Sequence, residues 1–205
     1  SIFLYLTANG GDTLGRPLTL LSFLLDDNGW PSDAFAFKRT SLLLHLINGL
    51  LLTLLLFRLG ARVGLDATLA RRAAVLGALL WLLHPLFVST TLYVIQRATI
   101  LATAFLLLSM LAWDACWQAQ VDGKLRRAWL PASGVLLAAL AGALCKANGI
   151  LTPVLLACTA CLVYRPLQGS LPAGSEASAA RIRRWTIELP AAASVVAILL
   201  YSAWS

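Results

Sequence analysis

Long runs of apolar residues constrain this chain more than any other feature. The longest run extends from Ala73 to Trp113, and only His84, Pro85 and Arg97 interrupt it. As one helix, its 41 residues would be about 60 Å long, which is twice the thickness of a bilayer core. Charged residues make up 12% of the chain, against about 25% in soluble domains. The sequence therefore predicts an all-α, polytopic membrane protein, and it excludes a disordered chain, a fibrous repeat and a disulfide-stapled secreted module.

The apolar runs divide into six expected transmembrane helices. The run at 73–113 must turn back near its polar and helix-breaking residues, between positions 84 and 97. The run at 128–164 is also longer than one span and is expected to turn at 145–149. The expected spans are approximately residues 41–57, 73–90, 97–113, 128–145, 149–164 and 187–204. Residues 165–186 are polar, contain Pro, Gly and Ser, and predict an exposed loop.

The connectors alternate between rich and poor in lysine and arginine. Eleven of the 16 Lys and Arg residues lie in one set of connectors and five in the opposite set. The rich set comprises residues 58–72, 113–127 and 165–186, and the poor set comprises residues 1–40, 84–97 and 145–149. Because arginine-rich connectors remain in the cytoplasm, we expect the poor set on the periplasmic, outer side. The net charge of +7 then follows from topology, and no basic stripe interleaved with aromatic residues indicates nucleic-acid binding.

Composition and the chain ends suggest where the protein resides and how it continues. Arginine outnumbers lysine 13 to 3, and Ala and Leu dominate, which indicates a GC-rich bacterium and hence its inner membrane. The sequence begins at Ser1 on the expected outer side and ends inside an apolar run. We therefore expect a piece of a longer protein, preceded by another span or a signal sequence.

Residues 1–40 form the expected outer loop, ahead of the transmembrane domain at 41–205. Within it, residues 14–25 begin with polar residues and continue with Leu and Phe, which predicts a helix lying on the membrane surface rather than crossing it. Asp26 and Asp27 then precede an Asn-Gly pair. The two aspartates suit a turn and cap, and the alternative is a metal or catalytic site.

Arg97 and Lys146 are each the only cation in a short outer turn between two apolar arms. A charge at membrane depth costs roughly 2.5–3.5 kcal/mol, so such residues usually pair with another group or line a wet cavity. Both could hold the phosphate of a lipid headgroup, with Arg gripping two oxygens and Lys acting as a point charge. The alternative is that each side chain extends to the interface or makes ordinary phospholipid contacts.

Further polar residues accompany these cations on the outer side. Gln96 and Asn148 lie next to them in sequence, and His45 lies within two turns of the outer end of the first span. His84 precedes Pro85 and could orient a substrate hydroxyl, or it could cap the helix end.

The cysteines give no sign of a redox or metal site. Cys158 and Cys161 form a CxxC, but they do so inside an apolar run without polar access or a second pair of ligands. We expect them to be small apolar packing residues. No metal cluster and no cofactor is apparent in the sequence.

Four sequence blocks resemble one family of membrane glycosyltransferases. Residues 15–23, GRPLTLLSF, resemble the "RPL-(T/S)-x-L-(S/T)-F" stretch of the protein O-mannosyltransferase-like enzymes that carry tetratricopeptide repeats after their membrane part. Residues 41–50, SLLLHLINGL, resemble that family's "NLLLHLxNxLL". The His-Pro at 84–85 followed by Arg-Ala at 97–98 resembles its "HPxxxExVxxxxxRAD", and Lys-Ala-Asn-Gly from position 146 resembles its "KExxxxxP".

The resemblance implies a GT-C membrane fold and sugar transfer on the outer face from a polyprenyl-phosphate-linked donor to a protein or glycan acceptor. An acid near the first outer loop would act as general base on the acceptor hydroxyl, and Asp12 is the nearest acid here. Cations would stabilise the leaving polyprenyl phosphate as its charge grows. The phosphate-binding set would be Arg16, Arg97 and Lys146, and the substrate-positioning set would be His84, Gln96 and Asn148. Tetratricopeptide repeats would follow Ser205.

The sequence also departs from the family at its acidic positions. Ser89 or Thr90 replaces the acid of the second outer loop, Thr99 replaces the Asp of the family's Arg-Ala-Asp, and Ala147 replaces the Glu after the Lys. The family's catalytic acid would precede Ser1. Two other functions therefore stay open, namely a catalytically inactive GT-C-derived scaffold that binds a partner protein or lipid, and a lipid or solute transporter.

Overall fold

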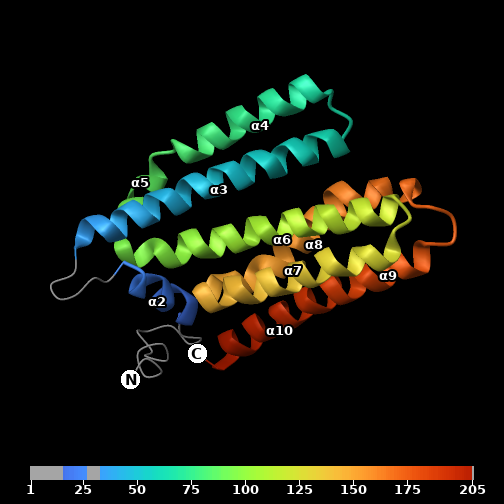
Figure 1. Ribbon diagram of the computed structural model, residues 1–205. Helices are drawn as coiled ribbons and strands as arrows, with labels where there is room; N and C mark the ends of the chain where they lie inside the picture. Colours follow the sequence, from blue (N-terminus) through green and yellow to red (C-terminus); the bar gives the residue numbers. More distant parts are fainter. Residues whose placement is uncertain (1–15, 27–32, 205) are drawn as a thin grey trace. The chain divides into compact units, whose positions relative to one another are not determined.

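A computed structural model describes residues 16–26 and 33–204, and all secondary structure in these residues is helical (Figure 1). The elements are α2 (Pro17–Leu24), α3 (Ala34–Arg62), α4 (Ala67–Leu82), α5 (Leu86–Leu92), η1 (Val94–Gln96), α6 (Arg97–Val121), α7 (Leu125–Cys145), η2 (Ala147–Leu151), α8 (Thr152–Thr159), η3 (Ala160–Tyr164), η4 (Arg165–Ser170), α9 (Glu176–Arg183), η5 (Arg184–Glu188) and α10 (Leu189–Trp204). Asp12 and Asp27 lie outside the described residues.

The helices agree with a polytopic membrane protein. Five are long and apolar enough to cross a membrane, and the bent pair α4 and α5 adds a sixth if it counts as one span. The five are Ala34–Arg62, Val94–Val121, Leu125–Cys145, Ala147–Ser170 and Glu176–Ser202. All of the expected spans except 73–90 fall within them, apart from the last two residues of the final one. The described helices are longer than expected because polar residues at their ends continue the helical turn beyond the apolar core.

The helix breaks within the approximate span 73–90, at the His84-Pro85 pair where the range expected for the turn, 84–97, begins. α4 ends at Leu82, α5 begins at Leu86, and the two are bent by 67°. Pro85 has no N–H and disfavours helical geometry in the residue before it, His84. The Leu86 N–H, which would bond to Leu82 in a continuous helix, donates instead to His84 Nδ1 at 3.3 Å. His84 thus caps the broken end, which is one of the two roles expected for it.

The expected loop at 165–186 is also mostly helical. The span from Ala147 continues through η4 to Ser170, and α9 begins at Glu176 and runs through η5 into α10. Only residues 171–175 lie outside helices. The Ala-rich stretch after Glu176 favours helix strongly enough to override the loop pattern of its polar residues. The polar residues of 165–186 therefore lie mostly in helices that extend beyond the apolar runs, and not in a loop.

The chain divides into two compact units, which are described separately. Unit 1 comprises Ser1–Leu107 with Leu140–Gly149, and unit 2 comprises Leu108–Ala139 with Ile150–Ser205. In unit 1, α3 and α4 run side by side and antiparallel (Figure 1). Small residues allow their close approach, since a Cβ on Gly60 would lie 3.2 Å from that of Ala70. In unit 2, α8 packs against α10.

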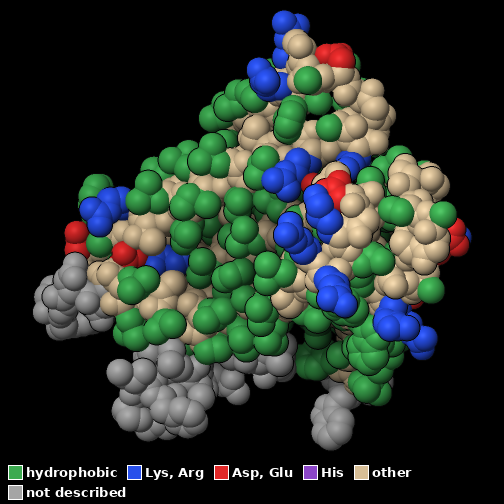
Figure 2. Space-filling view, turned by 45° about the vertical axis from the view of Figure 1, so that its right-hand side comes forward, with side chains coloured by type: hydrophobic (Ala, Val, Ile, Leu, Met, Phe, Trp, Pro, Cys, Tyr) green, Lys and Arg blue, Asp and Glu red, His purple; other side chains and the backbone are tan. Residues whose placement is uncertain are grey.

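Apolar side chains point outward and many polar ones inward, as expected for helices in lipid. Leu50 and Leu80 are more than two-thirds exposed, whereas Ser41, Asn48 and Ser109 are buried. Figure 2 shows hydrophobic side chains along the helices of the visible face, with Lys and Arg in separate groups. Because lipid offers no hydrogen bonds, buried polar groups must find partners within the protein. Ser109 does so in unit 2, where its hydroxyl donates to the Val135 carbonyl at 3.2 Å.

Gly149→Ala should destabilise the protein. A Cβ at Gly149 would overlap the backbone of Gly142 and Ala143, which cannot move aside as a flexible side chain can. Overpacking of this kind costs about 1–3 kcal/mol. Thermal unfolding in detergent should show a lower midpoint for Gly149→Ala and no loss for Gly169→Ala, because nothing lies within 4 Å of a Cβ at Gly169. Equal midpoints for the two variants would contradict this packing.

Candidate functional site

A stripe of polar residues lines the buried face of α3. Ser41, His45 and Asn48 are spaced by four and three residues, which places them on one face of the helix. The Asn48 amide donates to the Ile100 carbonyl at 2.9 Å. His45 Nε2 lies 3.2 Å from the Leu82 carbonyl, the acceptor left over where α4 breaks. The stripe therefore fastens α3 to the end of α4 and the start of α6.

Arg97 is the most completely enclosed charge in the described part of the chain. Its side chain is 0% exposed, and its Nη2 forms an ion pair with Asp26 Oδ2 at 2.6 Å. The same nitrogen donates to the Phe37 carbonyl at 2.7 Å, Nη1 donates to Ser22 O at 3.0 Å, and Nε donates to Ser41 Oγ at 3.3 Å. The guanidinium thus joins α2, α3 and α6.

Two aromatic rings and a hydroxyl complete the surroundings of this ion pair. The Arg97 guanidinium carbon lies 4.9 Å from the ring centre of Phe23 and 5.4 Å from that of Phe37. The other oxygen of Asp26 accepts a hydrogen bond from the Thr40 hydroxyl at 2.7 Å. Excluding water strengthens each of these interactions, and together they offset the cost of burying two charges.

The structure therefore gives Arg97 partners within the protein. An outer cation was expected either to hold a lipid phosphate or to extend to the interface, yet the guanidinium is enclosed by protein groups. Asp26 was expected to form a turn, with a metal or catalytic site as the alternative. Its N–H closes a turn onto the Phe23 carbonyl at 3.0 Å, and its carboxylate also neutralises Arg97. Phosphate binding by Arg97 stays a prediction. In this structure all three guanidinium nitrogens already bind protein groups.

Lys146 lies in a different environment, although it belongs to the same unit. Its ammonium is half-buried and donates to Thr99 Oγ1 at 2.8 Å. Thr99 in turn donates to Gln96 Oε1 at 2.9 Å. Within residues 16–26 and 33–204, no carboxylate lies within 4.0 Å of Lys146, and no second acceptor binds its ammonium. A lysine nitrogen carries three N–H donors, so this polar row leaves positive charge available to a ligand.

The other predicted site residues are less closely tied to this row. Asn148 and His84 are exposed, and the His84 ring accepts from the backbone of α5. Arg16 is half-buried ahead of α2. In α2 the Thr19 hydroxyl donates to the Cys145 carbonyl at 2.9 Å, which brings this helix to the turn that carries Lys146. The structure thus joins Gln96 to Lys146 through Thr99, while His84 and Asn148 lie on exposed turns.

Thr99 and Ser41 were not among the predicted site residues. Thr99 was noted only as a replacement for a family acid, yet it connects Lys146 with Gln96. Ser41 opens the polar stripe of α3 and binds Arg97. The signal for Ser41 was its spacing from His45 and Asn48 in an apolar run. For Thr99, the signal was its position two residues after Arg97, the only cation of its expected turn.

Metal ligands do not come together in the described residues, where no three His, Cys, Asp or Glu side chains form a group that could hold an ion. Cys158 and Cys161 are free and exposed on the helix surface, whereas Cys116 and Cys145 are buried. No family model, curated protein or solved structure matches this chain.

Removing the carboxylate of the buried pair should be far more costly than removing an exposed one. Asp26→Asn leaves Arg97 buried without its counter-charge, which costs about 3–5 kcal/mol. Glu188→Gln is the matched control, because Glu188 pairs with Arg183 at 2.7 Å but both side chains are partly exposed, and such pairs contribute at most about 1 kcal/mol. Thermal unfolding in detergent would measure both.

The double variant Asp26→Asn with Arg97→Gln provides a second check. Because it removes both charges, it should unfold at a higher temperature than Asp26→Asn alone. If Asp26→Asn costs no more than Glu188→Gln, the pair does not hold unit 1 together.

Proposed function

We propose that this chain is the membrane module of a GT-C-like glycosyltransferase that uses a polyprenyl-phosphate-linked sugar. The single observation that carries the proposal is the row formed by Lys146, Thr99 and Gln96. It combines a half-buried cation, a hydroxyl and an amide, and none of these has a carboxylate partner among the described residues. A phosphate needs positive charge and hydrogen-bond donors, and this row supplies both.

The chemistry proposed for this row is stabilisation of the leaving group. As the bond from sugar to phosphate breaks, negative charge grows on the phosphate oxygens, and a fixed ammonium lowers the energy of that state. The Gln96 amide nitrogen, which has no partner in the described residues, could donate to the same phosphate. Arg97 would then act as a positioning residue, because it holds α6 against α2 and α3. A protein or glycan would be the acceptor.

The proposed general base is an acid of the first outer loop. Of the described acids near this end of unit 1, Asp26 is paired with Arg97, and Asp33 accepts from the Phe35 N–H at 2.9 Å as the N-cap of α3. Asp12 is the proposed acid, and it lies outside the described residues.

The row formed by Lys146, Thr99 and Gln96 also supports a second function, a catalytically inactive GT-C-derived scaffold that binds lipid or a partner protein. The two functions share phosphate binding and differ in sugar transfer.

The proposed orientation places Lys146 on the periplasmic side of a bacterial inner membrane. In unit 1 the basic residues Arg58, Arg62, Arg71 and Arg72 lie at the α3–α4 connector. α3 ends at this connector, and the residues near its start, Phe37 and Ser41, contact Arg97, so the connector and Arg97 lie at opposite ends of α3. Since arginine-rich connectors stay in the cytoplasm, the Lys146 end would face outward.

Lys146→Gln should weaken binding of a short-chain polyprenyl phosphate by about tenfold or more, because a charged hydrogen bond contributes about 1.5–3 kcal/mol. Thr99→Val should weaken it less, since it removes only the group that orients the ammonium. Lys38→Gln is the matched control, because Lys38 is exposed on α3 and carries the same charge. Native mass spectrometry of the purified full-length protein would measure binding, and a sugar-transfer assay would separate enzyme from scaffold.

Binding that is equal in Lys146→Gln and Lys38→Gln would exclude the proposed phosphate site. Binding lost only in Lys146→Gln, together with no transfer by the unchanged protein to any supplied acceptor, would favour the scaffold.

Cysteine labelling from one side of the membrane should confirm the orientation. In a chain without its native cysteines, a cysteine at Asn148 should react with a membrane-impermeant reagent added to intact cells. A cysteine at Ser170, in the opposite set of connectors, should react only after the membrane is opened. Both residues are exposed, so access depends on the side of the membrane and not on burial. The reverse pattern would place Lys146 in the cytoplasm.

A further inference from the structure

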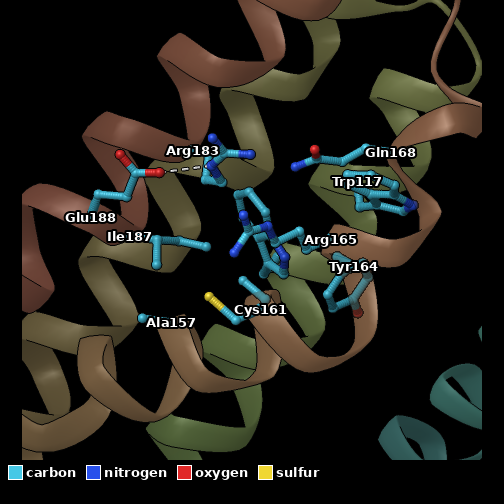
Figure 3. A pocket seen from close by; sticks show the side chains of 11 residues that line it. Trp117, Ala157, Cys161, Tyr164, Arg165, Gln168, Arg183, Ile187 and Glu188 are labelled. Atoms are coloured by element: carbon cyan, nitrogen blue, oxygen red, sulfur yellow. Dashed lines mark hydrogen bonds and ion pairs between the residues drawn. The ribbon is translucent and has the colours of Figure 1, made fainter.

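Unit 2 contains a cavity of about 380 Å³ that the proposed function does not use (Figure 3). Its walls come from α6, from the helix that runs from α8 through η4, and from the helix that runs from α9 through η5. The lining residues are Trp113, Trp117, Ala157, Ala160, Cys161, Tyr164, Arg165, Gln168, Arg183, Ile187 and Glu188. Figure 3 shows Arg183 and Gln168 toward one side of the cavity and Ala157 and Cys161 toward the other.

The cavity has an excess of one positive charge. Arg183 Nε forms an ion pair with Glu188 Oε1 at 2.7 Å, so these two charges compensate each other. The Arg165 side chain has no ion-pair or hydrogen-bond partner within the described ranges. Its five N–H donors, together with the Gln168 amide, face a space without a second acid, because Glu188 is the only carboxylate in the lining. The site is therefore suited to a ligand with one negative charge.

The aromatic part of the wall is rigid and contains an unused donor. Tyr164 is packed between Trp113 and Trp117, with ring centres 6.2 and 5.5 Å away, and its hydroxyl donates to the buried Asp114 at 3.1 Å. The hydroxyl is thus directed to Asp114. Trp113 is 2% exposed, and its indole N–H has no hydrogen-bond partner among the described groups. A buried donor without a partner is costly, so this N–H points independently to a ligand or water that the cavity receives.

The cavity also lies at the charged end of unit 2. Trp117 is one turn before the end of α6, and Arg165 opens the last turns of the span Ala147–Ser170. The exposed cations Lys124, Arg126, Arg181 and Arg184 lie on the connectors and helix ends of the same unit. Trp and Tyr beside Lys and Arg are typical of the headgroup level of a bilayer. A ligand at this depth would have a polar head and apolar chains.

We propose that this cavity binds the phosphate ester of an anionic glycerophospholipid. Arg165 would neutralise the phosphate, with Gln168 as a further donor, while the apolar wall from Ala157 to Ile187 would contact the glycerol and the first carbons of the acyl chains. A choline headgroup would bring a second cation close to Arg165, and Glu188 is already paired. The site therefore prefers an anionic lipid over a zwitterionic one. It lies wholly in unit 2 and does not depend on the proposed sugar transfer.

Binding of dioctanoyl phosphatidylglycerol to the full chain in a neutral detergent tests this site. Native mass spectrometry should show saturable binding that Arg165→Gln weakens by about tenfold, which corresponds to one lost charged hydrogen bond. Arg184→Gln is the matched control, because Arg184 is exposed, belongs to the same unit and does not line the cavity. Dioctanoyl phosphatidylcholine should bind more weakly, and inorganic phosphate should bind weakest, since it lacks the apolar chains.

Thiol protection supplies a second measurement on the unchanged protein. Cys161 lines the cavity and Cys158 does not, although both are exposed. Phosphatidylglycerol should slow the reaction of N-ethylmaleimide with Cys161 and leave Cys158 unaffected. Equal binding by Arg165→Gln and Arg184→Gln would overturn the proposal, as would equal protection of the two cysteines. Inorganic phosphate that binds as tightly as the lipid would replace the lipid with a soluble phosphate.

Discussion

Unit 1 depends on one buried charge, the guanidinium of Arg97, among helices that are long and apolar enough to cross a membrane. A fully buried charge is costly unless it is paired, and the chain satisfies Arg97 with the carboxylate of Asp26, two backbone carbonyls and a serine hydroxyl. These partners come from α2 and α3, so satisfying the charge also fixes the positions of both helices against the start of α6. An unpaired charge is costly in a site that excludes water. A displacement of α2 would remove Asp26 and Ser22 from the guanidinium, so this cost fixes the position of α2.

The two cations Arg97 and Lys146 consequently have different surroundings. The N–H donors of Arg97 are bound to protein groups. Lys146 donates to one hydroxyl, and its other N–H donors have no acceptor among the described residues. Thr99 connects these roles, because it lies two residues after the fixed arginine and binds the ammonium of Lys146. Arg97 fixes the start of α6, and Thr99 on that helix then orients the ammonium of Lys146. This difference supports the proposal that Lys146 binds a phosphate. Arg97 would position α6, the helix whose Thr99 orients Lys146.

The sequence predicted the helical spans well, because apolar runs of bilayer length leave little choice of structure. It also predicted a helix at 14–25, and α2 (Pro17–Leu24) falls inside that range. It placed the turn of the long run between positions 84 and 97, and the helix does break at His84-Pro85, but it mistook the helical segment after Glu176 for a loop. The partner of Arg97 could not be predicted, because several outer acids were available and their pairing depends on how α2 packs. The same holds for Thr99, whose importance comes from a contact with a residue 47 positions away.

The most direct test of these different roles uses the three lysines of the chain, Lys38, Lys124 and Lys146. Reductive methylation with a ¹³C label gives each lysine its own NMR signal, and replacing each lysine in turn by arginine assigns the three signals. Titration with a short-chain polyprenyl phosphate should shift the signal of Lys146 in a saturable way and leave those of Lys38 and Lys124 in place. A Lys146 signal that stays unchanged, or that moves no more than that of Lys38, would contradict the account.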